Sequence, residues 1–156
     1  MKKAMNYILI ILLVLGLSGC SKNVIKDLEI NNNECKIEQE IDTHGGFLGD
    51  GEYFAKINCK DIKPNQLSSN WKKVPISDNV KELLDMDQCD EDSCKNFYER
   101  YNVPDITNGY YLLKDRHSET KDTYDDTNIN NRASWNVTLV LLDNNTNTIY
   151  YYRLDT

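Results

Sequence analysis

Alternating apolar and polar residues predict an antiparallel strand pair early in the chain. Odd-numbered residues in 35–42 and 52–59 are mostly apolar or cysteine, which is the two-residue period of a strand with one buried face. Folding the two segments together gives the opposed pairs Ile41–Tyr53, Ile37–Ile57 and Cys35–Cys59. The intervening loop, 43–51, holds four glycines. Glycine tolerates positive φ angles and close backbone contacts, so we expect a tight loop there.

The clearest hairpin lies at the C-terminus. Apolar residues alternate through 135–142 and return in 149–154, separated by the turn-forming residues 143–147. We expect Ile149 and Tyr151 to share a sheet face with Leu139 and Leu141. Both faces of this hairpin carry apolar residues, which predicts two strands in the interior of a sheet.

Between the two hairpins the apolar spacing becomes helical. Ser77 or Asn79 can cap a helix with a buried stripe at Val80, Leu83 and Leu84. Apolar residues at Cys94, Phe97, Tyr98 and Tyr101 predict a second short helix that Pro104 ends. A further strand is expected over 110–116.

These elements together predict an α+β fold, an antiparallel sheet of about five strands with one or two short helices packed on one face. We expect one globular domain over residues 34–156. The polar segment 20–33 is expected to act mainly as a tether.

The N-terminus has the pattern of an export signal. Two lysines precede an apolar run over 7–17, which is shorter than the roughly 20 residues of a membrane-spanning helix. The run ends in Leu17-Ser18-Gly19-Cys20, which resembles the lipobox of bacterial lipoproteins. The resemblance implies that residues 1–19 are removed, that Cys20 is acylated, and that the domain is held at the extracytoplasmic face of the cell membrane.

Four further cysteines remain after Cys20, and an even number in an exported chain indicates disulfides. The strand register favours Cys35–Cys59, because directly opposed strand residues lie close enough for a bridge. Cys89 and Cys94 flank a short loop that a second bridge could close. A four-cysteine zinc site is the alternative, but no C-x2-C pair occurs.

The charge balance limits the partners of the domain. The whole chain carries a net charge of −7, and removing Lys2 and Lys3 leaves 16 basic against 25 acidic residues. Nucleic acid is therefore an unsuitable partner, because it needs a basic face. Membrane attachment is expected to depend on the lipid anchor, and the other partner is expected to be a protein or a small molecule.

Both histidines of the chain lie in polar clusters that follow expected strands. If the two strands are neighbours, their clusters converge into one polar site. The candidate residues of this site are His44, Asp50, Asp115, Arg116, His117 and Glu119. Such a set suits a divalent cation or general acid–base catalysis. The alternative is structural, with the side chains stabilising a glycine-rich turn and pairing with neighbours.

Other chemical signals are weaker. Asp126, Asn128 and Asn130 match the first ligand positions of a calcium loop, but the later glycine and glutamate positions do not match. No H-E-x-x-H or G-x-S-x-G motif is present. The sequence therefore identifies no catalytic residue, and a divalent cation is the one cofactor left open. The tyrosines at 150–152 form either a binding face or ordinary strand positions.

Three segments together resemble a family of small bacterial lipoproteins without an assigned role. They are D-T-H-G-G-F-L-G-D-G at 42–51, N-G-Y-Y-L-L-K-D-R-H-S-E at 108–119, and the end of the chain from W-N-V-T at 135 to Y-Y-Y-R-L-D-T at 150–156. The resemblance implies an exported lipoprotein and supplies no catalytic residues. We expect a non-enzymatic binding or interaction domain. The alternatives are a cation-dependent or hydrolytic activity around His44 and His117, and a structural envelope protein.

Overall fold

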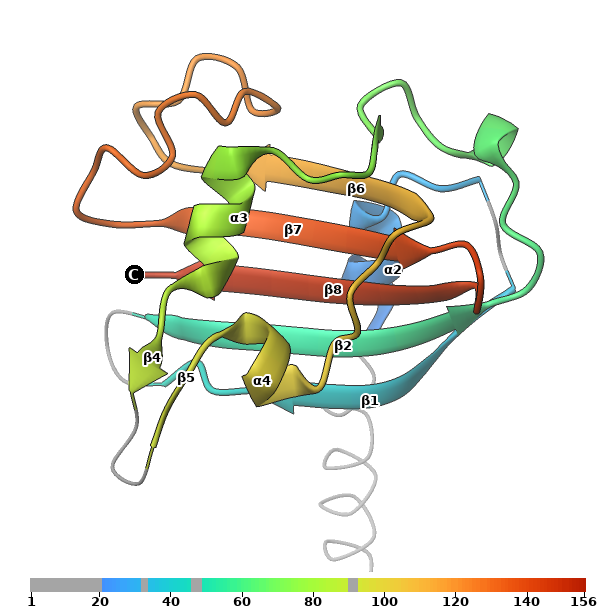
Figure 1. Cartoon of the computed structure of the whole chain (residues 1–156), viewed down its shortest axis with the longest axis horizontal. Coiled ribbons are helices and arrows are strands. Elements are labelled where there is room, and N and C mark those ends of the chain that lie inside the picture. The colour runs from blue at the N-terminus through green and yellow to red at the C-terminus, as the bar shows by residue number, and fades with distance from the viewer. Residues whose placement is uncertain (1–20, 32–33, 46–48, 90–92) are drawn as a thin grey trace, which may run out of the picture.

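The fold is built on one antiparallel sheet. The computed structural model describes residues 21–31, 34–45, 49–89 and 93–156, so the expected export signal and Cys20 lie outside the described residues. Six strands lie in the order β1-β2-β8-β7-β6-β3 (Figure 1). Their bounds are β1 Cys35–Asp42, β2 Gly51–Cys59, β8 Thr148–Asp155, β7 Asn136–Asp143, β6 Gly109–Asp115 and β3 Lys72–Lys73. The expected α+β class is confirmed.

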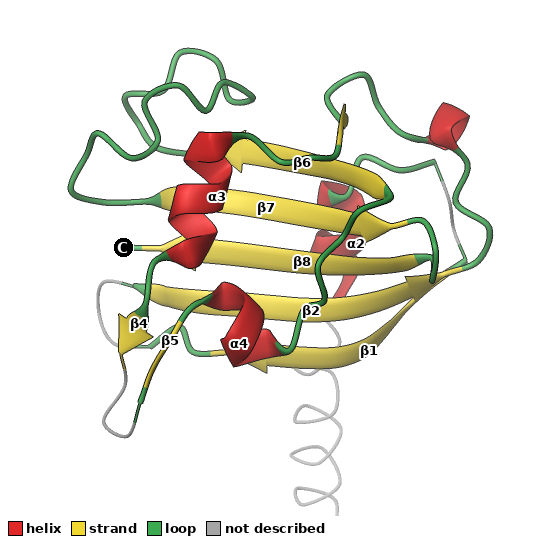
Figure 2. Cartoon of the chain, in the orientation of Figure 1, coloured by secondary structure: helices red, strands yellow, loops and turns green. Residues whose placement is uncertain are grey.

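Helices cover both faces of the sheet (Figure 2). Helices α3 (Asp78–Asp85) and α4 (Phe97–Tyr101) pack on one face, as expected, and α2 (Ser21–Asp27) packs on the other. A two-stranded sheet, β4 (Gln88–Cys89) and β5 (Cys94–Lys95), joins α3 to α4, and the 3-10 turn η1 spans Pro64–Gln66. None of the described helices has the length and apolar character needed to span a bilayer.

Capping residues fix the ends of the two expected helices. Ser77 is the N-cap of α3, and its hydroxyl accepts a hydrogen bond from the Val80 N–H at 3.3 Å. Asn96 caps α4 in the same way through the Glu99 N–H. Asn102 ends α4 in the left-handed conformation, two residues before Pro104. The capping prediction for α3 and the predicted stop of α4 are confirmed.

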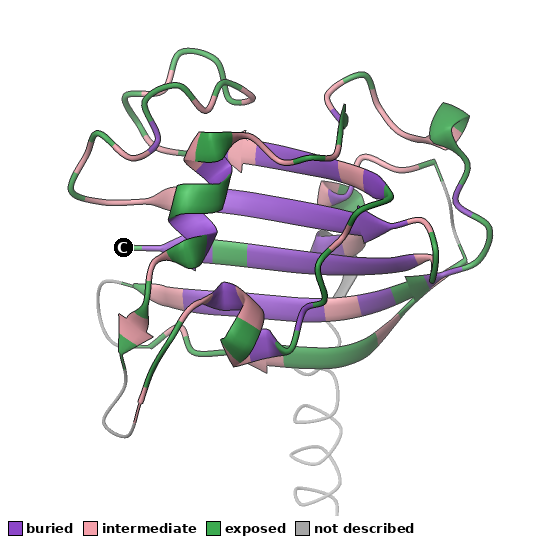
Figure 3. Cartoon of the chain, in the orientation of Figure 1, coloured by how far each residue is buried: buried purple, intermediate pink, exposed green. Residues whose placement is uncertain are grey.

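Two hydrophobic cores lie on opposite faces of the sheet. Val80, Leu83 and Leu84 of α3 join Leu139 and other sheet residues on one face. Val24 and Leu28 pack with residues of β2, β6, β7 and β8 on the other. Strands β7 and β8 are buried on both faces (Figure 3). The tyrosines at 150–152 are at most 6% exposed, so they belong to the cores and do not form a binding surface.

The strand registers differ from the expected ones at two places. Cys35 and Ile37 pair as expected, but a bulge follows, and Ile41 opposes Phe54 instead of Tyr53. The bulge moves Ile41 to the α3–α4 face, where it packs with that core. In the C-terminal hairpin Ile149 opposes Leu142, whereas the expected face shared with Leu139 and Leu141 requires a register shifted by one residue. A one-residue shift reverses the faces, so Ile149 lies with Val140 and Leu142.

The two expected disulfides are present. Cys35 bonds Cys59 across the end of β1 and β2, and Cys89 bonds Cys94 across β4 and β5. The zinc alternative for these cysteines is therefore wrong. The first bridge closes a span of 24 residues, which restricts the unfolded chain as well as the edge of the sheet.

The segment after α2 is bound tightly to the domain, although we expected it to be a tether. Trp71 donates its indole N–H to the Leu28 carbonyl at 3.0 Å, and Leu28 is 1% exposed. The Glu29 carboxylate then accepts four contacts, from Ser68 Oγ (2.7 Å), Asn70 Nδ2 (3.0 Å), Tyr124 OH (2.6 Å) and Lys114 Nζ (2.9 Å). Burial acts to raise the pKa of Glu29, but these donors outweigh it and lower the pKa to about 2.

Helix α4 is held by a buried aromatic and polar cluster. The Tyr101 ring stacks on Phe54 with centroids 4.2 Å apart. Its hydroxyl donates to the buried Glu52 carboxylate, and burial together with Glu52 raises the pKa of Tyr101. Arg100 of the same helix donates to the Gln88 carbonyl at 2.6 Å. These contacts give α4 a fixed position over β2 and β8.

Candidate functional site

A network of charged groups lies at one end of the sheet. Strands β1, β8 and β6 run in the same direction, because an antiparallel strand separates each from the next, and all three therefore finish at this end. Asp155, at the end of β8, accepts from Arg116 Nη2 at 2.6 Å and from Arg153 Nε at 2.7 Å. The His44 ring lies on its other side, with Nε2 at 3.1 Å. Asp155 therefore joins two of the expected site residues.

His44 lies between two carboxylates. Its Nδ1 is 2.7 Å from Asp42 Oδ1, and its Nε2 faces Asp155. Only a doubly protonated imidazole can donate to both oxygens at once. Burial acts to raise the pKa of Asp42 and of Asp155, but hydrogen bonds from His44 and from Arg116 respectively outweigh it, so the pKa of each carboxyl is below its usual value.

The loop glycines have a specific role at Gly51. A Cβ there would lie 2.6 Å from the His44 Cα, and the backbone has φ +153°. Only glycine allows the start of β2 to pass so close to the His44 backbone. The last glycine of the D-T-H-G-G-F-L-G-D-G segment therefore positions His44 against Asp155.

His117 belongs to a different cluster. Asp115 is buried and accepts from the His117 backbone N–H at 3.1 Å and from Thr120 Oγ1 at 2.6 Å, while Arg132 pairs with it at 2.7 Å. Burial acts to raise the pKa of Asp115, but the hydrogen bonds, chiefly from Arg132, outweigh it and lower the pKa. The His117 ring contacts Ser134 Oγ and the Glu119 N–H, both at 3.3 Å. The ring is therefore engaged within its own loop.

The structure does not bring the two histidines into one site. Strands β2, β8 and β7 lie between β1 and β6, so the strands that precede the two histidines are about 19 Å apart. The His44 ring bonds to Asp42 and Asp155, whereas the His117 ring bonds to Ser134 and Glu119. The premise that the two strands are neighbours is therefore wrong, and the clusters are linked only indirectly through Arg116 and Asp155.

Neither of the two carboxylates expected at Asp50 and Glu119 bonds to a histidine side chain; Glu119 reaches the His117 ring only through its backbone N–H. The Asp50 side chain is exposed, and its backbone carbonyl accepts from the Gly45 N–H at 3.4 Å. Glu119 lines a polar hollow of about 470 Å³ together with Asp115 and Arg132. Within the part of the chain that the structure describes, no three His, Cys, Asp or Glu side chains gather closely enough to hold a metal ion.

The residues of the possible calcium loop support α3 instead. The Ser77 hydroxyl donates to the Asp126 carboxylate, and Asn79 Nδ2 donates to the Asp126 carbonyl at 3.1 Å. Asn130 donates to the Asn79 carbonyl and to Glu82. These side chains are used in holding the N-terminus of α3 against the 118–135 segment.

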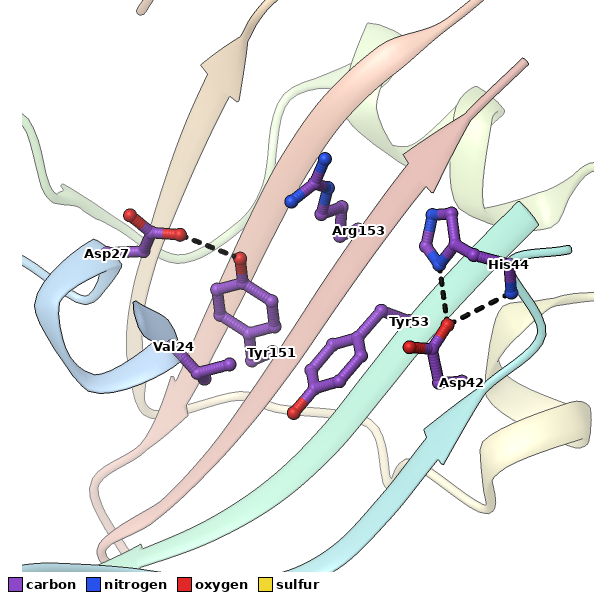
Figure 4. Close-up of a pocket in the computed structure, with 7 residues that line it drawn as sticks. All are labelled: Val24, Asp27, Asp42, His44, Tyr53, Tyr151 and Arg153. Carbon is purple, nitrogen blue, oxygen red and sulfur yellow. Dashed lines mark hydrogen bonds and ion pairs between the residues drawn. The ribbon is translucent and has the colours of Figure 1, made fainter. Parts of the chain in front are cut away.

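A small pocket lies beside His44 on the α2 face (Figure 4). It has a volume of about 230 Å³ and is lined by Val24, Asp27, Asp42, His44, Tyr53, Tyr151 and Arg153. Its polar groups bond to protein partners: Tyr151 donates to Asp27 at 3.1 Å, and Arg153 donates to Asp155. Both His44 ring nitrogens face carboxylates. Neither nitrogen therefore points into the pocket toward a ligand.

A larger groove lies between α3 and α4 on the opposite face. Its volume is about 620 Å³, within the range of sites that bind small molecules. Apolar residues from three separate segments form its floor and walls, namely Val74, Pro75, Ile76, Val103, Ile106 and Leu141. Asp78, Lys81, Tyr98 and Asp105 add polar groups. We name this cavity the α3–α4 groove.

Comparison with known proteins gives no relative from which a site could be transferred. The chain matches no protein-family model, no curated protein and no solved structure.

No local sequence pattern marks the α3–α4 groove, because the residues that line it are scattered along the chain. The groove residues lie in segments 74–81, 98–106 and at 141, and no motif links them. The available signal was a set of apolar residues next to prolines, at Val74, Ile76 and Val103, outside the helical stripes that fill the core. All three of these residues line the groove.

Proposed function

We propose that this chain is an extracytoplasmic lipoprotein, acylated at Cys20, whose domain binds a small ligand in the α3–α4 groove. The groove is the observation that carries the binding function. It combines an apolar floor with a few polar groups at its rim, which is the usual composition of a ligand site.

The framework of the groove favours binding of a ligand over catalysis. Its floor residue Leu141 belongs to a buried central strand, and one wall is the fixed helix α4. Among the described residues that line the groove there is no serine, cysteine or histidine, the residue types that most often serve as nucleophile or general base. A preformed apolar site of this kind suits reversible binding.

The export proposal predicts a lipid at position 20. When the full chain is expressed in bacteria grown with an alkyne-labelled fatty acid, we expect label on the protein and loss of residues 1–19. Cys20→Ala should abolish the label, while Cys35→Ala should keep it. Intact mass spectrometry and in-gel fluorescence measure both. Equal labelling of the Cys20→Ala variant would contradict the anchor.

The binding proposal predicts that blocking the groove removes ligand binding without unfolding the domain. Ile106 lines the groove and is only half-buried, so Ile106→Trp fills space at the groove without a large change in the core. A ligand-observed NMR screen of small soluble compounds against the full chain in lipid nanodiscs should give hits that Ile106→Trp loses.

A substitution in the other pocket tests whether the loss of binding is specific to the groove. Val24 lines the small pocket on the other face, so Val24→Leu should retain the same hits. Thermal unfolding of Ile106→Trp should remain within a few degrees of the wild-type protein. Hits that bind the blocked variant equally well, or a screen without hits, would count against the groove as the binding site.

A further inference from the structure

The rim of the α3–α4 groove is acidic. Asp78 and Asp105 line the groove, and Glu82 and Asp85 lie on the adjoining outer side of α3. Among the described residues, Asp78, Asp85 and Asp105 have no ion pair, and all three are exposed. Acidic residues outnumber Lys81 along this rim, so the rim has a net negative charge.

Within the described chain, Lys81 is the one basic residue that lines this region. It lies on α3 three residues after Asp78 and four before Asp85, and side chains at these spacings are neighbours on a helix surface. The positive charge of Lys81 is thus offset by carboxylates of its own helix. Asp105, on the opposite side of the groove, keeps an uncompensated negative charge.

Tyr98 adds an aromatic ring next to these carboxylates. It is half-buried in α4 and lines the groove. Burial, together with nearby Asp85 and Asp105, raises the pKa of Tyr98 to about 12, so the phenol stays neutral. An aromatic ring beside carboxylates recognises organic ammonium groups through cation–π and ionic contacts.

We propose that the α3–α4 groove binds a small amphipathic cation, with an apolar body on the Leu141 floor and an ammonium group between Tyr98 and Asp105. This inference rests on the proposed binding function and names its ligand class. A volume of about 620 Å³ is sufficient for a drug-sized molecule, so we commit to a free small molecule and not to a peptide.

Three matched probes with one fluorophenyl body test the charge preference. They are 4-fluorophenethylammonium, 2-(4-fluorophenyl)ethanol and 3-(4-fluorophenyl)propionate, followed by ¹⁹F NMR with the full chain in nanodiscs and with empty nanodiscs as the blank. We expect the ammonium to bind about tenfold more tightly than the alcohol, the ratio for one partly desolvated ion pair. The propionate should bind more weakly still.

Two variants with the same loss of charge localise the effect. Asp105→Asn should reduce ammonium affinity to that of the alcohol and leave alcohol binding unchanged. Asp61→Asn removes a carboxylate beside Ile62, which packs in the core of the opposite face, and should change none of the three affinities. Raising NaCl from about 50 to 500 mM should weaken binding of the ammonium alone.

The outcomes separate this inference from the proposed function. Equal affinities for the three probes, all lost in Ile106→Trp, would overturn the cation preference and retain the groove as a binding site. No binding of any probe, or binding unaffected by Ile106→Trp, would overturn both. A short lysine-containing peptide that binds more than tenfold tighter than the ammonium would overturn the commitment to a small molecule.

Discussion

Gly109→Ala is expected to destabilise the domain by about 3 kcal/mol or more. A Cβ at Gly109 would lie 1.9 Å from the Leu142 carbonyl oxygen and 3.1 Å from Ile106 Cγ2. The oxygen belongs to the backbone of β7, which is buried between two strands, so it cannot move aside without disturbing the β6–β7 pairing. Urea denaturation followed by circular dichroism measures the loss.

Gly45→Ala is the matched control for this prediction. The nearest atom to a Cβ at Gly45 is the Thr43 carbonyl oxygen at 3.8 Å, an ordinary contact. The change should leave the free energy of unfolding within about 0.5 kcal/mol, because an added methyl in open space mainly restricts the unfolded chain. If Gly109→Ala were as stable as Gly45→Ala, the close approach of Gly109 to the Leu142 carbonyl would be contradicted.

Glu29→Ala is expected to cost about 3 kcal/mol at pH 7. The substitution leaves Lys114, whose side chain is 16% exposed, without its carboxylate partner, and it removes the acceptor of Ser68, Asn70 and Tyr124. Unpaired polar groups in this position lose water without regaining hydrogen bonds. Denaturant titration at pH 7 measures the effect.

The same residue predicts a pH dependence with a definite sign. The pKa of Glu29 falls from 4.5 to about 2 on folding, so the unfolded chain binds the proton more tightly. The stabilisation is complete above about pH 4.5 and is lost as the pH falls toward 2. The difference between the wild-type protein and Glu29→Ala should therefore shrink over that range.

Glu38→Ala controls for the loss of a glutamate as such. Glu38 is 44% exposed and lies 3.7 Å from Lys56, and an exposed pair of this kind contributes about 0.5 kcal/mol. Equal losses in Glu38→Ala and Glu29→Ala would contradict a special role for the Glu29 contacts.

Local patterns were sufficient to predict most elements of the fold. The N-cap at Ser77, the stop before Pro104 and the opposed cysteines at 35 and 59 all follow from short-range rules. The predicted strand registers were wrong where the register depends on packing between distant parts of the chain. The bulge after Ile37 lets Ile41 pack in the core on the other face. Strand β7 is buried on both faces, so no polar face identifies its register with β8.

The candidate site was harder to predict, because strand order decides which chain segments meet. His44 and His117 follow strands that end at one edge, yet three strands separate them. Asp155, which does contact His44, had no signal beyond its place at the end of the last strand. Glu29 lay in a polar segment whose composition is typical of a linker, and its four partners come from distant parts of the chain.

The packing of α2 has a consequence for how the protein would lie on a membrane. Helix α2 begins at Ser21, directly after the proposed acylated cysteine, and it is fixed to the sheet by Val24, Leu28 and the Glu29 contacts. With a lipid at position 20, no flexible linker would separate the bilayer from the domain. The anchor would then be attached through the face of the sheet opposite to the α3–α4 groove.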